Sequence, residues 1–252
     1  MTLRAESVSF AYRPGMPVLR DVTCEIEPGR VTAILGPNGS GKTTLLRLLL
    51  GFRRPSTGHV RLNGLEVASM APGRRASRMA YMAQRPAIAF AFSVREVVAL
   101  GRHGFAGRRD AGPVERGMER AGVSSLADAP IGELSVGQQQ LVGMARALAQ
   151  LDGPGEGKWL LADEPLSALD PAHTRRCQGI FRALARDGVG VGIVIHDVTT
   201  AVRTSDRTIL LTGEGSVGGA GATREVCEPS LLAEVYAAPF VRSGEDVLPA
   251  TA

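Results

Sequence analysis

The pattern of apolar and polar positions predicts a chain in which strands and helices alternate. Residues 3–10 alternate apolar with polar side chains and residues 18–26 carry a second short pattern of this kind, so both are predicted strands. Val31–Leu35 is almost wholly apolar and runs into a glycine-rich loop, which is typical of a buried strand. Residues 42–50 are rich in helix formers and are followed by Gly51, which predicts a helix that ends there.

The middle of the chain changes to a helical pattern. Residues 60–62 lead into Asn63-Gly64, which predicts a strand entering a tight turn, and residues 79–83 predict a further short strand. Beyond about residue 86 the apolar spacing is helical, with predicted helices over residues 94–101, 114–121 and 137–150. We interpret residues 86–156 as a helical lobe inserted into an α/β core.

The core pattern resumes after the lobe. Strands are predicted over residues 159–162, 191–195 and 208–211, with helices over residues 172–186 and 198–204 between them. Strands that alternate with helices of this length favour right-handed parallel crossovers. The rest of the chain is expected to hold a glycine-rich turn over residues 213–221 and two short helices.

The composition is that of a globular chain. Of the 252 residues 44% are hydrophobic and 21% are charged. The longest stretch without a charged residue, 134–145, is far shorter than the roughly 20 apolar residues that a membrane-spanning helix needs. The first residues lack a signal-peptide pattern, and the three cysteines show no metal-binding spacing and suit a reducing compartment, so we expect a cytosolic location.

The basic excess does not indicate nucleic-acid binding. The formal net charge is +4, but the 29 basic residues are spread along the chain rather than gathered in blocks. Aromatic residues make up only 4% of the chain, too few for a platform on which bases stack. We therefore expect no nucleic-acid partner.

A phosphate-binding loop is the strongest chemical signal in the sequence. The pattern GxxxxGK[ST], set between a predicted strand and a predicted helix, is met in full by Gly36, Pro37, Asn38, Gly39, Ser40, Gly41, Lys42 and Thr43. Its glycines let backbone N–H groups turn towards phosphate oxygens, and the helix presents its positive end to the anion. Lys42 would bind the β- and γ-phosphates, Thr43 would ligate Mg²⁺, and Thr44 is a further candidate contact to the nucleotide.

Two acidic residues and one histidine complete a candidate hydrolytic site. The apolar strand at residues 159–162 ends in Asp163 and Glu164, and His196 follows the apolar run 191–195. In an open parallel sheet ligands bind at these strand ends. Asp163 would hold the metal, Glu164 would orient or deprotonate the attacking water, and His196 would contact the γ-phosphate.

The motifs together resemble those of ATP-binding cassette (ABC) transporter ATPases. In order along the chain, residues 36–43 match the Walker A motif, Gln84 the Q-loop, residues 134–138 the signature, Asp163-Glu164 the Walker B motif, residues 167–170 the D-loop and His196 the H-loop. The resemblance covers nearly the whole chain. It implies an α/β P-loop NTPase fold with a RecA-like core (2–85 and 157–240), an N-terminal antiparallel β subdomain, the helical lobe (86–156) and a C-terminal tail (241–252).

The resemblance also implies a dimer. In this family two cassettes close head to tail around two ATP molecules, so that Ser135, Gly137 and Gln138 of one copy face the Walker A loop of the other. Ser135 and Gly137 stand at the start of the predicted helix, where N–H groups and the helix dipole favour an anion. Hydrolysis would remove the nucleotide that bridges the two copies.

Three further roles follow from the same resemblance. Gln84 would bind Mg²⁺ or the attacking water and relay closure to a membrane partner. Tyr12 would stack on adenine, with a packed surface tyrosine as the alternative. Asp170 would shape the nucleotide site of the opposite copy.

Two positions depart from the family pattern. Val136 stands in the third place of the signature, where glycine is usual, and is tolerable if its φ is negative and its side chain points away from the site. Leu141 stands where related importers usually have arginine, which removes one expected ion pair. We nevertheless predict a working ATPase.

The choice of branch rests on three segments. Residues 92–102 resemble the segment after the Q-loop in importers of iron-siderophores, haem and vitamin B12. Residues 149–159 lengthen the loop before the Walker B strand, as in haemin-importer ATPases, and the closing stretch, with residues 228–232 and 235–236, is also similar to that branch. The resemblance favours haem uptake, with import of an iron-siderophore or cobalamin as the alternative. It implies a peripheral subunit at the cytoplasmic face of the inner membrane, two copies of a separate permease, and a periplasmic binding protein that acts through the permease.

Other classes of ATPase fit the chain less well. DNA-repair and chromosome-organising ABC ATPases insert long coiled coils, for which the stretch between Gln84 and Ser135 has no room. ABC proteins of translation carry two cassettes, and a P-loop kinase would lack the signature segment.

Overall fold

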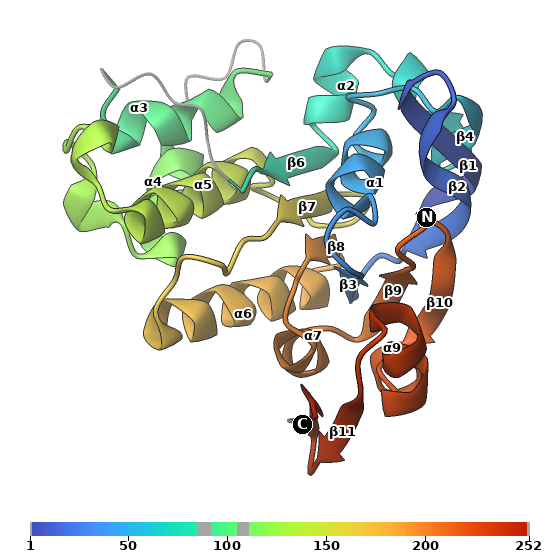
Figure 1. Cartoon of the computed structure of the whole chain (residues 1–252). Coiled ribbons are helices and arrows are strands. Elements are labelled where there is room, and N and C mark those ends of the chain that lie inside the picture. The colour runs from blue at the N-terminus through green and yellow to red at the C-terminus, as the bar shows by residue number, and fades with distance from the viewer. Residues whose placement is uncertain (1, 85–91, 105–110, 251–252) are drawn as a thin grey trace.

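The computed structural model describes residues 2–84, 92–104 and 111–250, and its strands form three sheets (Figure 1). The four-stranded antiparallel sheet has the order β2-β1-β4-β5 and consists of β1 (Leu3–Arg13), β2 (Met16–Ile26), β4 (Thr57–Leu62) and β5 (Leu65–Glu66). The six-stranded sheet has the order β10-β9-β3-β8-β7-β6. A two-stranded hairpin of β11 (Phe240–Ser243) and β12 (Asp246–Pro249) follows near the C-terminus.

The six-stranded sheet is the core of the molecule. Its parallel strands are β3 (Val31–Leu35), β6 (Met79–Met82), β7 (Trp159–Asp163), β8 (Gly190–Val194) and β9 (Arg207–Leu211), and β10 (Val217–Ala222) lies antiparallel at one edge. Every residue of β3, β7 and β8 is buried, as expected of parallel strands that are covered on both faces.

The two faces of this sheet pack into different hydrophobic clusters. Ile34 and Leu161 point into the cluster that contains the antiparallel sheet and α1 (Lys42–Leu49). Ala33 and Leu160 point the other way, into the cluster that holds the lobe and α6 (Pro171–Arg186). Figure 1 shows the lobe and the antiparallel sheet on opposite sides of the molecule.

The helical lobe consists, in its described part, of α3 (Val94–Ala99), α4 (Gly112–Ala121) and α5 (Val136–Gln150), with short 3₁₀ turns between them. These helices match the three predicted ones to within two residues at each described boundary. Further helices are α2 (Pro72–Ala76), α7 (Val198–Thr204), α8 (Thr223–Val226) and α9 (Pro229–Tyr236). Within the described ranges, none of the helices is long and apolar enough to cross a bilayer.

The expected glycine-rich turn over residues 213–221 is wrong in its second half. Residues from Val217 onwards form strand β10, paired with β9. A Cβ on Gly218 would lie 3.0 Å from Val235, and one on Gly219 would lie 3.0 Å from Leu231. Glycine is needed at these positions because α9 packs closely on the strand. Its low strand propensity is outweighed by that packing.

The segment beyond residue 240 is an ordered hairpin that packs on α7. Val247 is fully buried, and its carbonyl oxygen accepts a hydrogen bond from the hydroxyl of Thr199 in α7 over 2.8 Å. Asp246 forms an ion pair with Arg203, which is also in α7. The sequence analysis did not predict this hairpin or the short elements β5 and α2. All three are short and lack a clear apolar period.

Candidate active site

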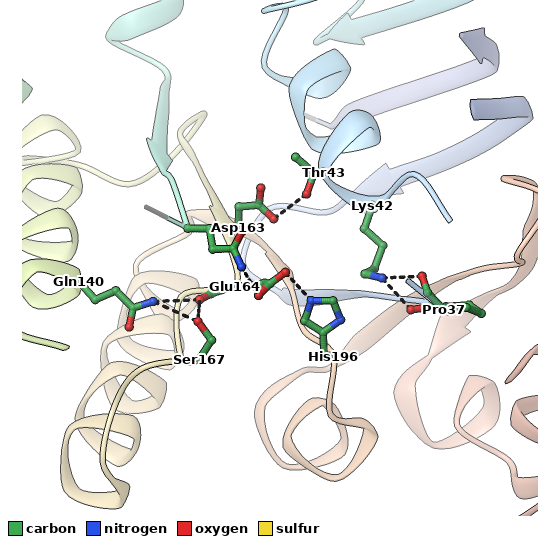
Figure 2. A network of polar contacts seen from close by, with 10 residues as sticks. Pro37, Lys42, Thr43, Gln140, Asp163, Glu164, Ser167 and His196 are labelled. Atoms are coloured by element: carbon green, nitrogen blue, oxygen red, sulfur yellow. Dashed lines mark hydrogen bonds and ion pairs between the residues drawn. The ribbon is translucent and has the colours of Figure 1, made fainter. Parts of the chain in front are cut away.

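The candidate site lies where three neighbouring core strands end. β3 leads into the glycine-rich loop, β7 ends at Asp163 with Glu164 directly after it, and His196 follows β8 (Figure 2). Because β3, β8 and β7 are adjacent and parallel, their carboxyl ends meet at one edge. A cavity of about 340 Å³ opens there, and the residues that line it are Val18, Asn38, Gly39, Gly41, Lys42, Thr43, Thr44, Glu164 and His196.

The loop has backbone geometry that only glycine adopts without strain. Gly36, Gly39 and Gly41 have φ values of +147°, +83° and +92°. A Cβ on Gly36 would lie 2.5 Å from the Leu211 carbonyl oxygen, whereas one on Gly39 would meet nothing within 4 Å. Gly41 is the N-cap of α1 and provides no side-chain cap, so the N–H groups of the first turn remain available to an anion.

Lys42 is buried and folds back over its own loop. Its ammonium donates to the carbonyl oxygens of Gly36 over 2.7 Å and Pro37 over 2.8 Å. Burial lowers the pKa of Lys42, opposed by the charges of Glu164 and Asp163. The cation is therefore held beside the loop by neutral carbonyl groups, which an anionic ligand can replace.

Thr43 and Asp163 come together from two different elements. The Thr43 hydroxyl donates to Asp163 Oδ1 over 3.1 Å, and Asp163 is 3% exposed. Burial raises the pKa of Asp163, and the bond from Thr43 opposes that shift. Two of the three expected magnesium ligands are thus neighbours, and both offer the hard oxygen atoms that this ion prefers.

Glu164 is the centre of a polar network (Figure 2). Gln84 Nε2 donates to Glu164 Oε2 over 2.6 Å, and His196 Nε2 pairs with Glu164 Oε1. All three expected catalytic side chains therefore meet. Glu164 has a φ of +50°, a conformation that costs a non-glycine residue about 1–3 kcal/mol and that concentrates at functional sites.

Gln140 is a member of this network that the sequence analysis missed. Its side chain is 2% exposed, and its amide nitrogen donates to the Glu164 carbonyl oxygen over 3.2 Å and to the Ser167 hydroxyl over 3.4 Å. Its amide oxygen accepts from the Ala168 N–H over 3.3 Å. One buried amide thus connects the lobe to the segment that follows Glu164. The signal in the sequence that could have indicated this residue is a polar side chain within an apolar helix face, because a buried polar group needs a hydrogen-bond partner.

The signature segment lies away from the cavity in this chain. Ser135 caps α5: its hydroxyl accepts from the Gln138 N–H over 3.2 Å, while Gln138 Oε1 accepts from the Ser135 N–H over 2.9 Å. Neither residue, nor Gly137, lines the cavity around the phosphate loop. A Cβ on Gly137 would lie 2.9 Å from the Ala168 carbonyl oxygen, which gives this glycine a packing reason within the chain.

The two departures from the family pattern are accommodated. Val136 is the first residue of α5, and 61% of its surface is exposed. It therefore has helical backbone geometry, with negative φ, and points into solvent, as its tolerance requires. Leu141 is 2% exposed and packs in the lobe core. An apolar side chain there needs no ion-pair partner, so the loss of the expected ion pair leaves no buried charge unpaired.

Neither Tyr12 nor Asp170 is among the residues that line the cavity around the phosphate loop. Tyr12 is 49% exposed, contacts the Thr44 hydroxyl over 3.3 Å and packs edge-on against Phe10. Asp170 caps α6, and its two carboxylate oxygens are bound by the N–H and the ring Nδ1 of His173, each over 2.8 Å. The His173 N–H and side chain lower the pKa of Asp170.

A parallel core with this loop, these strand-end acids and, in an inserted lobe, a helix with an exposed and capped N-terminus defines a nucleotide-hydrolysing cassette. Residues 19–167 match the ABC transporter family, and the chain belongs to that family. It is 40% identical over 242 residues to the hemin import ATP-binding protein HmuV of Bordetella avium, with 94% of this chain and 92% of that protein covered.

Two solved structures have the same fold. An inward-facing, putative metal-chelate type ABC transporter matches with a TM-score of 0.79 and 25% identity, covering 99% of this chain and 98% of that one. A dimeric ATP-binding cassette in a post-hydrolysis state, bound to ADP and phosphate, matches with a TM-score of 0.79 and 26% identity, covering 89% and 99%. The expected family and fold class are confirmed, and the chain is an ABC ATPase.

Proposed function

We propose that the chain is the ATP-hydrolysing subunit of a haem importer. The observation that carries the ATPase site is the convergence of Lys42, Asp163 and Glu164 at one strand edge, with Glu164 held by Gln84 and His196. The haem cargo is supported by the 40% identity to a hemin import ATP-binding protein over nearly the full length of both chains. An iron-siderophore or cobalamin is the alternative cargo, and the likeness to a putative metal-chelate type transporter is compatible with all three, since each is a metal chelate.

Within the site each residue has a distinct part. The backbone from Gly36 to Thr44 would cradle the phosphates with Lys42 among them, and Tyr12 would stack on adenine. Thr43 and Asp163 would hold Mg²⁺, with Gln84 beside them, and the ion would neutralise charge on the β- and γ-phosphates. Glu164 would orient the attacking water and His196 the γ-phosphate.

The second half of the site would come from another copy of the chain. Ser135, Gly137 and Gln138 stand at the start of α5, outside the cavity formed by their own chain. The first-turn N–H groups of this helix suit the γ-phosphate bound by a partner, and Asp170 would lie near the same boundary. A homodimer of cassettes, as in the ADP-bound relative, follows from this division.

A groove between core and lobe is the proposed contact with the permease. It holds a cavity of about 320 Å³, and the residues that line it include Phe52, Arg75, Met79, Leu100, Arg146 and Gln150. Phe52 is 51% exposed and Leu100 43%, so apolar surface is open to a partner. Two copies of a separate permease would place the chain at the cytoplasmic face of the inner membrane, with a periplasmic binding protein acting from the other side.

Reconstitution with the permease tests this proposal. ATP turnover by the assembled transporter is expected to rise when the binding protein is supplied with haem, and not with a ferric siderophore or cobalamin. A Glu164→Gln subunit is the matched control for background hydrolysis. Turnover at the control level would refute the ATPase site, whereas stimulation by another cargo would refute haem import alone.

A further inference from the structure

The C-terminal helix α9 reaches the phosphate loop through one side chain, that of Tyr236. Its hydroxyl accepts a hydrogen bond from the Gly36 N–H over 3.1 Å, although the two residues are 200 positions apart. Strand β3 ends at Leu35, and its register with β8 ends at the pair Ile34 and Val194. The Gly36 amide therefore lies just beyond that ladder, and Tyr236 provides the acceptor that β8 no longer supplies.

The backbone N–H and the carbonyl oxygen of Gly36 are both hydrogen-bonded to side chains. Its N–H is bound by Tyr236, and its carbonyl oxygen accepts from the Lys42 ammonium over 2.7 Å. The residue has no side chain of its own to fix it, and its φ of +147° leaves room for none. The direction in which the loop leaves β3 therefore depends on these contacts.

The position of Tyr236 is fixed by the packing of α9 and of its own ring. Leu232 of α9 is fully buried, and Val235 and Leu231 fit over the glycines of β10. The Tyr236 ring packs against Phe240, with ring centroids 5.5 Å apart. Burial raises the pKa of Tyr236 to about 12, so the hydroxyl stays neutral under physiological conditions.

We propose that Tyr236 is a positioning residue for nucleotide binding, which makes α9 a structural part of the ATP site. By fixing the Gly36 amide, the hydroxyl would hold the loop in the shape that presents its N–H groups to the phosphates, before any nucleotide arrives. Preorganisation of this kind raises affinity because the loop loses less freedom on binding. The inference rests on the assignment of the loop to ATP.

The test is a Tyr236→Phe variant of the full chain, which removes the hydroxyl and keeps the ring. The Kd for Mg-ATP, measured by calorimetry, is expected to rise about three- to tenfold, the range of one lost hydrogen bond. With the permease present, KM is expected to rise by a similar factor while kcat at saturating ATP changes by less than about twofold. Hydrogen exchange of the peptide spanning the loop is expected to be faster in the nucleotide-free variant.

Thr199→Val is the matched control, because it removes one hydrogen bond from the C-terminal hairpin without touching the loop. Its Tm is expected to fall, whereas its Kd for ATP and its loop exchange should equal those of the wild type. A Tyr236→Phe chain that loses Tm but keeps wild-type affinity and loop exchange would show a packing role only and overturn the inference. If the wild-type chain itself failed to bind ATP, the assignment of the loop would fall as well.

Discussion

The phosphate-loop edge of the core and the signature end of the lobe differ in how their residues are held in place. At the core edge, Lys42, Asp163 and Glu164 are largely buried. Asp163 and Glu164 are bound by side chains from distant parts of the chain, and Lys42 is bound by carbonyls of its own loop. At the lobe end, the side chains of Ser135 and Gln138 bind each other's backbone N–H groups, and Val136 is open to solvent. The side-chain contacts of Asp163 and Glu164 span the fold, whereas the capping bonds of the signature helix lie within residues 135–138.

The difference indicates what each region needs. The core edge must hold charged groups at fixed positions before a ligand binds, which requires support from several strands and loops. The lobe end has only to present N–H groups at the start of a helix, and a local capping box is sufficient for that. A site divided in this way suits a switch, because its two halves can separate without disturbing the interior of either.

The largest expected effect comes from Glu164→Gln at the core edge. The amide keeps the shape of the side chain but cannot accept a proton, so turnover is expected to fall about 10²–10⁴-fold while ATP is still bound. Phosphate release and ATP retention, measured on the same preparation, check both parts. Loss of ATP binding would indicate instead that Glu164 is a structural member of its network with Gln84 and His196.

Mixing two inactive variants tests the division itself. A chain with Lys42→Ala lacks the core half, and one with Ser135→Arg lacks the lobe half, so neither should hydrolyse ATP alone. An equal mixture forms mixed dimers with one intact site, and about a quarter of wild-type turnover is expected if the sites act independently. Activity no higher than that of the separate variants would contradict a site shared between two copies.

Gln140 connects the two regions, and its loss is expected to have an intermediate effect. Gln140→Leu leaves the Glu164 carbonyl and the Ala168 N–H without this partner, so kcat should fall about tenfold, with a smaller change in the Kd for ATP. Gln139→Leu is the control, because the Gln139 side chain donates to the Ile131 and Leu134 carbonyls, which lie within the lobe. Equal losses in the two variants would mean that the connection has no catalytic role.

The sequence predicted most of the core because strong periods and glycine loops mark it. Val31–Leu35 and Val198–Thr204 were located to the residue, and the site residues of the Walker A, Q-loop, Walker B and H-loop motifs lie together as expected. What escaped prediction depends on contacts between distant segments. Gln140 and Tyr236 gain their partners only through packing, and a strand as rich in glycine as β10 has no pattern until α9 covers it.

The smallest expected effect concerns Ala237, which ends the helix that supports the phosphate loop. Its φ of +51° and ψ of +36° place it in the left-handed region, where glycine is favoured after a helix. Ala237→Gly is expected to raise the free energy of unfolding by about 0.5–1 kcal/mol, measured by urea denaturation, because relief of strain outweighs the added freedom of the unfolded chain. Ala237→Val should lower it, since a β-branched residue fits this region poorly. The Ala237→Gly chain should bind ATP with wild-type affinity, because Tyr236 keeps its place; a shift in Kd would mean that the end of α9 must be strained for the loop to be held correctly.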